Sequence, residues 1–201
     1  MPAYIGARAA RYPRAMAHAT GDPALEALRF PVGRFEAQPS YTEQDLRELI
    51  DRLALGPRRL ATAVRGLAGV QLETPYRPGG WTARQVVHHV ADSHMNAFAR
   101  FRLALTEERP TIKPYDEARW GELADSKTAP IELSMALLEP LHERWVRLLR
   151  SLKAADWKRE YFHPEHGRTF TLAEALAQYA WHGEHHTAHV SSLRARAGWK
   201  T

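Results

Sequence analysis

Four stretches of the chain repeat apolar residues at the spacing of three to four that places them on one face of an α-helix. Each stretch follows a threonine, whose side chain can accept a hydrogen bond from the unpaired amides of a first helical turn. The predicted helices span residues 42–68, 82–106, 128–152 and 171–197. Gly56, Pro57 and Pro140 lie inside two of these helices and predict kinks or short breaks there.

The segments between the helices are rich in turn-forming residues, and none alternates apolar and polar positions as a half-buried strand does. Residues 1–28 are rich in Ala, Arg and Pro and show little periodicity, which predicts a poorly ordered N-terminal extension. Four amphipathic helices joined by long loops are typical of an all-α fold, an antiparallel four-helix bundle. We therefore expect one folded domain over residues 29–201.

The composition is that of a soluble globular protein, with 44% hydrophobic and 25% charged residues among 201. No apolar run approaches the roughly 18 residues of a membrane span, and no signal-peptide core follows the N-terminal arginines. The net charge of +5 is spread along the chain, so we do not expect nucleic-acid binding. The chain has no cysteine, which suits the cytoplasm and restricts metal ligands to histidine and carboxylate.

Histidine is the unusual residue, because seven of the eleven fall in two short windows. The windows contain His88, His89 and His94, then His182, His185, His186 and His189. At 100° per residue, His182 and His186 lie about 40° apart on the apolar side of the last helix. Two imidazoles one turn apart can bind the same metal ion.

The other residues of the second window lie less favourably for a metal. His185 and His189 have the same four-residue spacing but sit towards the edge of the apolar stripe. Glu184 lies on the opposite side and is expected to face solvent rather than act as a general base. Surface histidines, or core histidines bonded to backbone carbonyls, are the alternative interpretation. We favour a metal because burying two unpaired imidazoles together is costly.

A site inside a bundle needs a further ligand from a facing helix, and residues 82–106 offer two. His94 lies near the centre of the apolar face and His89 at its margin, whereas His88 is expected to face water. Ser93, Asn96 and Arg100 line up with His89, as in the wall of a cleft or at an ordinary helix boundary. Periodicity alone does not choose between His89 and His94.

Several long runs resemble the YfiT-like metal-dependent hydrolases of the DinB superfamily. They lie, in order, at residues 74–96, 111–116, 125–128, 141–145 and 181–189. The resemblance covers residues 29–201 and implies a four-helix bundle in which three histidines hold one zinc or nickel ion. In that family the ligands are the second histidine of a His-His pair and a His-x-x-x-His pair. The resemblance therefore implies His89, His182 and His186 as the metal ligands.

The resemblance also implies an activity, a metal-dependent hydrolase, with two alternatives. One is a transferase that moves the thiol bacillithiol onto electrophiles at the same metal, and the other is a non-catalytic metal-binding scaffold. Three histidines leave an open position that can hold water or the sulfur of a thiol supplied from outside. The resemblance further implies a homodimer.

Polar residues near the predicted site are candidates for catalysis or substrate contacts. They are Asp92, Asn96 and Arg100, of which Arg100 could hold a carboxylate of a small thiol such as bacillithiol. Three residues just before the second helix, Tyr76, Arg77 and Trp81, could form the rim of a pocket. Trp145 and Tyr179 recur among aliphatic residues at helical spacing and are expected in the core.

Overall fold

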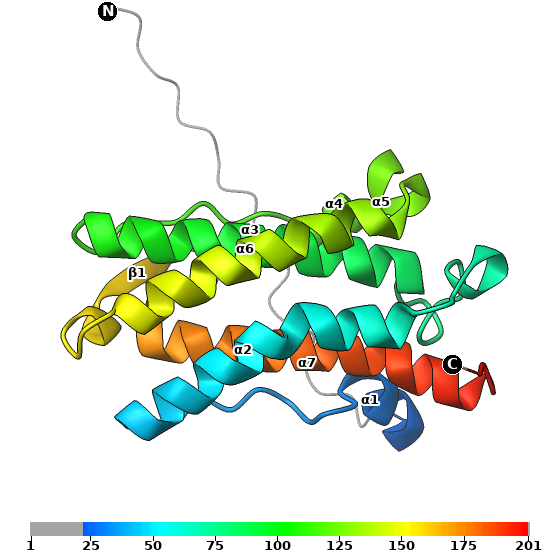
Figure 1. Cartoon of the computed structure of the whole chain (residues 1–201), viewed down its shortest axis with the longest axis horizontal. Coiled ribbons are helices and arrows are strands. Elements are labelled where there is room, and N and C mark those ends of the chain that lie inside the picture. Colours follow the sequence, from blue (N-terminus) through cyan, green and yellow to red (C-terminus); the bar gives the residue numbers. More distant parts are fainter. Residues whose placement is uncertain (1–21, 201) are drawn as a thin grey trace, which may run out of the picture.

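The computed structural model describes residues 22–200, and four long helices form its frame (Figure 1). They are α2 (Glu43–Val64), α3 (Ala83–Thr106), α6 (Ile131–Ser151) and α7 (Leu172–Arg196). The predicted all-α four-helix bundle is confirmed.

Two pairs of successive long helices, α2 with α3 and α6 with α7, lie diagonally across the bundle. α2 packs against α6 and α7, and α3 packs against the same two helices. Arg52 of α2 contacts Glu184, and Ala63 contacts Arg194, so α2 and α7 run in the same direction. α3 and α6 are likewise parallel to each other and antiparallel to that pair (Figure 1). The antiparallel pairing of α3 with α7 brings the two histidine-rich windows side by side.

Three of the four predicted threonine caps are present. The Oγ1 atoms of Thr42, Thr82 and Thr171 each accept a hydrogen bond from the amide three residues later, at 3.1–3.2 Å. The prediction for Thr128 was wrong, because Thr128 ends the short helix α5 (Ala124–Thr128) and α6 begins after Pro130. A residue before proline is disfavoured in helical conformation, and Ala129 accordingly has an extended ψ of 149°.

Besides the four long helices and α5, residues 22–200 contain two further short helices and two 3₁₀ turns. α4 spans Glu117–Gly121, and 3₁₀ turns occur at Gly69–Gln71 and Asp156–Lys158. The helix α1 spans Pro23–Arg29, so the expectation of a poorly ordered segment was wrong for residues 23–28. Residues 1–21 lie outside the described part of the chain, and the boundary at residues 28–29 stays a prediction.

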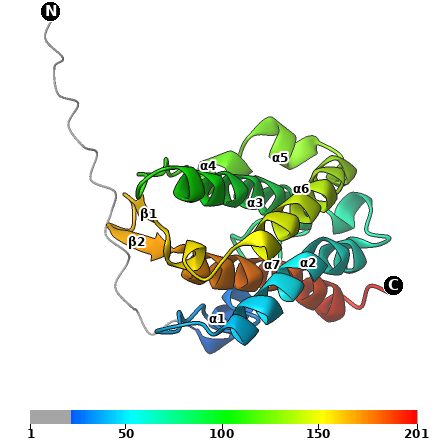
Figure 2. The same ribbon diagram turned by 60° about the vertical axis from the view of Figure 1, so that its left-hand side comes forward.

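A β-hairpin that the sequence pattern did not indicate lies against the ends of α3 and α7 (Figure 2). β1 (Glu160–His163) pairs antiparallel with β2 (Arg168–Thr171). Each strand has only four residues, too few for a clear alternation. The hairpin is held by tertiary contacts: the amide of Ile112 donates to the carbonyl of Phe162 at 3.0 Å.

α2 and α6 continue through Pro57 and Pro140, so the predicted breaks are absent. A helical proline has no amide hydrogen, so Pro57 leaves the carbonyl of Leu53, four residues earlier, without its helical partner. Nδ1 of His142 in α6 donates to that carbonyl at 2.9 Å. Gly56 makes room for the ring, since a Cβ there would lie 3.3 Å from Cε1 of His142.

The core consists of two apolar clusters with a polar layer between them. Phe101, Trp145 and Leu176 belong to the first cluster. Leu138 and Val190 belong to the second. On each of the four long helices, one short segment separates the residues of the two clusters. These segments contain Gly56–Pro57 on α2, His94 on α3, His142 on α6 and His182–His189 on α7.

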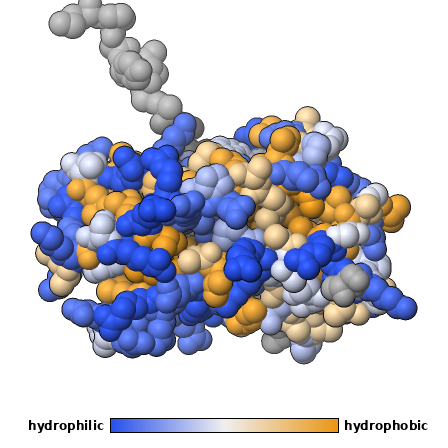
Figure 3. Space-filling model, in the orientation of Figure 1, coloured by the Kyte–Doolittle hydropathy of each residue, from blue (hydrophilic) through white to orange (hydrophobic). Residues whose placement is uncertain are grey.

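Hydrophilic and hydrophobic residues are interspersed on the face drawn in Figure 3. Within residues 22–200, no helix combines the length and apolar character needed to cross a bilayer.

Leu138 and Leu133 of α6 provide a matched test of the packing. Leu138 is 0% exposed, whereas Leu133 is 64% exposed. We expect Leu138→Ala to lower the free energy of unfolding by about 2–5 kcal/mol through the cavity it leaves. We expect Leu133→Ala to change it by no more than about 0.5 kcal/mol. Urea unfolding followed by circular dichroism measures both, and equal effects would contradict the described orientation of α6.

Candidate metal centre

The polar layer between the apolar clusters is built mainly of histidines, and we call it the histidine layer. Its members are His89 and His94 of α3, His142 of α6, and His182, His185, His186 and His189 of α7. All are buried except His182, which is partly exposed. Because seven imidazoles are concentrated in one layer, their hydrogen bonds determine which ring nitrogens are free to bind a ligand.

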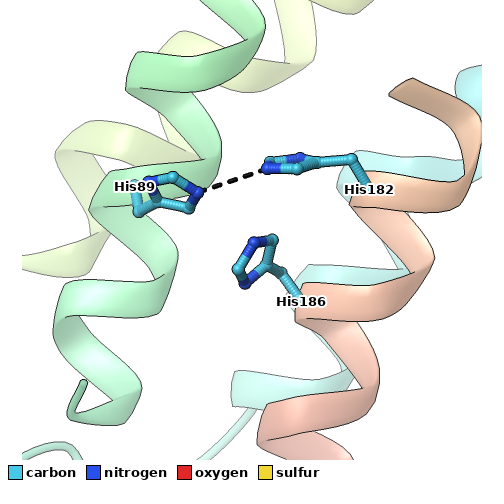
Figure 4. Close-up of side chains that lie close together, drawn as sticks. All are labelled: His89, His182 and His186. Carbon is cyan, nitrogen blue, oxygen red and sulfur yellow. Dashed lines mark hydrogen bonds between the residues drawn. The ribbon is translucent and has the colours of Figure 1, made fainter. Parts of the chain in front are cut away.

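Three histidines of the layer converge on one point. Ligand nitrogens of His89, His182 and His186 lie within 4.8 Å of one another. Figure 4 shows the His89 ring reaching across from α3 to the two rings of α7, with Nε2 of His89 3.2 Å from Nε2 of His182. Nitrogen ligands of a tetrahedral zinc ion, about 2.0–2.1 Å from the metal, are roughly 3.3 Å apart. The donor set and its spacing therefore fit a metal ion.

The three rings are held in their neutral form, which is the form that binds metal. Burial, together with the nearby His185 and His189, lowers the pKa of His89 to about 3. Burial also lowers the pKa values of His182 and His186 well below the usual value, and neighbouring histidines add to the effect. Near neutral pH each ring therefore has one nitrogen with a lone pair.

A chain of hydrogen bonds fixes which nitrogen of His182 has the lone pair. The carbonyl of Leu53 can only accept, so Nδ1 of His142 is a donor and its Nε2 is an acceptor. Nε2 of His142 accepts from Nδ1 of His94 at 2.7 Å, and Nε2 of His94 accepts from Nδ1 of His182 at 3.1 Å. Nε2 of His182 is therefore left with its lone pair, beside His89.

A second chain of the same kind acts on His186. The carbonyl of Arg29, at the end of α1, accepts from Nε2 of His189 at 3.1 Å. Nδ1 of His189 is then an acceptor and lies 3.4 Å from Nδ1 of His186, which leaves the lone pair of His186 on Nε2. His185, His186 and His189 form a second group of nitrogens within 4.8 Å. A neutral His186 has one lone pair, so the two groups are alternatives for one ion.

The structure corrects one prediction about burial in the histidine windows. His88 is buried instead of facing water, with its ring nitrogens 2.7 Å from Oγ of Ser134 and 3.1 Å from the carbonyl of Ala129. The α5–α6 junction covers this face of α3, which periodicity within one helix cannot show. His189 lies at the edge of the apolar stripe but is also buried, against Tyr76 at a ring-centroid distance of 3.9 Å.

Glu184 points away from the histidine layer, towards α2. It accepts hydrogen bonds from Arg52 and Arg59, both at 2.6 Å, and its side chain is partly exposed. This placement agrees with the expectation that Glu184 is not a general base for the site.

A cleft of about 380 Å³ opens onto the converging histidines. His89, His182, His185 and His186 line one part of it. The remaining lining residues are Trp81, Ser93, Arg100, Tyr115, Glu117, His163, Glu165, His166, Gln178, Tyr179 and Trp181. A position beside the three histidines is therefore accessible to a small molecule.

The sequence-based candidates for the cleft divide into two groups. Arg100 and Trp81 line it, and the Trp81 ring lies 4.4 Å from that of His89. Asp92, Asn96, Tyr76 and Arg77 are not among its lining residues. Burial and the nearby Asp125 raise the pKa of Asp92 to about 6. Asn96 donates to the carbonyl of Asp92. Asp92 therefore lies near α5, and neither residue lines the cleft with the histidines.

Several lining residues were not found by sequence reasoning. Tyr115 comes from the loop before α4, and His163, Glu165 and His166 come from the β-hairpin. No local signal marks them, because the packing of loop and hairpin beside α3 and α7 places them there. Tyr179 was expected in the core; it is buried, but its hydroxyl also accepts from Nη1 of Arg100 at 3.1 Å. Trp145 is fully buried, as predicted.

Comparison with known proteins places the chain in a family. Residues 52–190 match the model of the DinB superfamily. A protein of Bacillus mycoides (strain KBAB4), named "Putative metal-dependent hydrolase", is 52% identical over 175 residues, 87% of this chain and all of that protein. A Bacillus cereus (strain 03BB102) protein of the same name is 53% identical over 172 residues, covering 86% of this chain and 98% of its own.

A solved structure agrees with the sequence relatives. YfiT from Bacillus subtilis superimposes with a TM-score of 0.85 at 48% identity, covering 87% of this chain and 99% of that one. It is described as "a probable metal-dependent hydrolase with an unusual four-helix bundle topology". With its family model, its relatives and its fold in agreement, this chain belongs to the DinB superfamily.

Proposed function

We propose that this protein is a metal-dependent hydrolase whose metal is held by His89, His182 and His186. The observation that carries the proposal is the convergence of these three neutral imidazoles beside an open cleft. Three histidine ligands with an accessible fourth position are typical of catalytic rather than structural zinc sites. The names of the relatives support the same activity class. We propose zinc or nickel as the metal, since both suit imidazole ligands.

The cleft favours this group of histidines over the alternative group of His185, His186 and His189. His89, His182 and His186 all line the cleft, whereas His189 does not. Nε2 of His189 is already bonded to the carbonyl of Arg29, and Tyr76 stacks on its ring. We therefore assign His189 the role of orienting His186.

The protein's own residues then have distinct tasks. A divalent metal would supply Lewis acidity, polarising a substrate carbonyl and making a water molecule acidic enough to attack near neutral pH. His89, His182 and His186 present lone pairs to it, and His94, His142 and His189 fix their orientation. Trp81 covers His89 and limits access of bulk water from its side.

The first prediction concerns metal content. Untagged protein should contain about one zinc or nickel ion per chain by elemental mass spectrometry. His182→Ala should lose it, because it removes one of three neutral ligands. His166→Ala is the matched control, since His166 is an exposed histidine of the same cleft outside the three-histidine group. Absence of metal from the wild type, even after reconstitution, would contradict the proposal.

The second prediction concerns turnover. The metal-loaded protein should hydrolyse a member of a panel of small esters and amides, and His186→Ala should lose at least about 100-fold in rate. The same proteins are assayed with bacillithiol and monochlorobimane, because the accessible metal position would also bind a thiolate. Conjugation without hydrolysis would replace the hydrolase by a thiol transferase, and metal binding without either reaction would leave a scaffold.

The third prediction concerns the hydrogen-bond chain behind His182. His142→Leu removes the acceptor for Nδ1 of His94, so we expect metal affinity about 10–100-fold lower. His142→Gln can still accept from His94 and donate to Leu53, and should restore most of the affinity. Competition with a chromophoric chelator measures both variants. Equal affinities for His142→Leu and His142→Gln would show that the chain does not orient the ligand.

A further inference from the structure

Arg100 is a buried cation that forms no ion pair with any of the described residues 22–200. The residue is 9% exposed and lines the cleft beside the histidine layer. Within the described residues, no carboxylate lies within 4.0 Å of its guanidinium, and its one side-chain hydrogen bond goes from Nη1 to the hydroxyl of Tyr179. Burying a charge without a counter-charge is costly, so this arrangement points to an anion that is supplied from outside.

A second polar group in the same cleft also has no partner. His163 of β1 is 6% exposed, and its Nδ1 is buried without a hydrogen-bond partner in the described chain. Burial, with nearby His166 and Arg100, lowers the pKa of His163 to about 4, so the ring is neutral near pH 7 and can donate one hydrogen bond. Arg100 and His163 come from α3 and the hairpin and line one cleft.

The neighbouring hydroxyl groups complete a set of donors. Because Tyr179 accepts from Arg100, its own hydroxyl hydrogen is available to a ligand. Tyr115 lines the cleft as well, and burial raises its pKa, so it stays a protonated donor. The cleft therefore has a neutral, metal-ligating part at the histidines and a donor-rich part at Arg100.

We propose that Arg100, His163 and Tyr179 form a binding subsite for a carboxylate group of the substrate, held in the same cleft as the reacting bond. With Nη1 directed to Tyr179, Nε and Nη2 of Arg100 remain as a planar pair of donors that matches a carboxylate. A single arginine balances one negative charge. Glu117 and Glu165 also line the cleft and would disfavour a doubly charged phosphate.

The inference rests on the proposed function, because the metal site defines where the reacting bond of the substrate lies. Its test does not need turnover. Benzoate is the probe, and benzamide is its uncharged counterpart of the same shape. Carboxylates also bind metals directly, so binding is measured by calorimetry on the His186→Ala protein as well as on the metal-loaded wild type. Benzoate binding that persists in the His186→Ala protein would support the subsite independently of the metal, so failure of the subsite and failure of the proposed metal function are distinguishable.

We expect benzoate to bind both proteins and benzamide to bind at least about tenfold more weakly. Arg100→Gln should weaken benzoate binding about tenfold or more at unchanged metal content. Arg102→Gln is the matched control, because it removes the same charge from an exposed position on the same helix. His163→Phe removes the second donor and should also weaken benzoate binding.

A buried arginine can be needed for folding, so one readout uses the wild type alone. In ¹⁵N-labelled protein, benzoate should shift a single slowly exchanging arginine Nε–H resonance, and benzamide should not. No benzoate binding at millimolar concentration, or equal effects of Arg100→Gln and Arg102→Gln, would overturn the proposal. Arg100-dependent binding of inorganic phosphate that exceeds that of benzoate would overturn the carboxylate assignment.

Discussion

The hydrogen bond from His142 to the carbonyl of Leu53 is the constraint on which the site depends. Pro57 frees that carbonyl from the α2 ladder, and Gly56 lets the imidazole approach it. Because a carbonyl can only accept, the direction of every later bond follows, through His94 to His182. A proline inside a helix, which costs helix stability, thus determines which nitrogen of a proposed metal ligand is free.

The site is assembled at the one level of the bundle where all four long helices depart from apolar packing. Apolar clusters on either side of the layer exclude water from the histidines. Burial disfavours the charged form of an imidazole, so the rings stay neutral and keep the lone pairs that a metal ion needs. Rings that bond to one another, to Leu53 and to Arg29 satisfy most of the layer's polar atoms. His89, His182 and His186 are the part of the layer that a metal ion would complete.

The cleft contains two different chemical environments. Its histidine part is neutral and suited to a soft or borderline metal, and its Arg100 part is cationic and donor-rich. A substrate held at both ends would have its reacting bond placed between them, which is how binding energy is converted into orientation. The β-hairpin and the loop before α4 supply much of the second environment, so the substrate preference depends on segments outside the four long helices.

The sequence by itself determined the four helices, three of their caps and the candidate pair His182 and His186, because helical periodicity and capping are local properties. It left His89 and His94 open, since both lie on or beside one apolar face. Tertiary structure separated them: His89 reaches the pair on α7, whereas His94 supports His182 from behind. It also buried His88 and brought Tyr115 and His163 to Arg100. These outcomes depend on which elements pack against one another. Hydrophobic periodicity describes one helix at a time, so it does not predict the helix partners or the positions of short strands and loops.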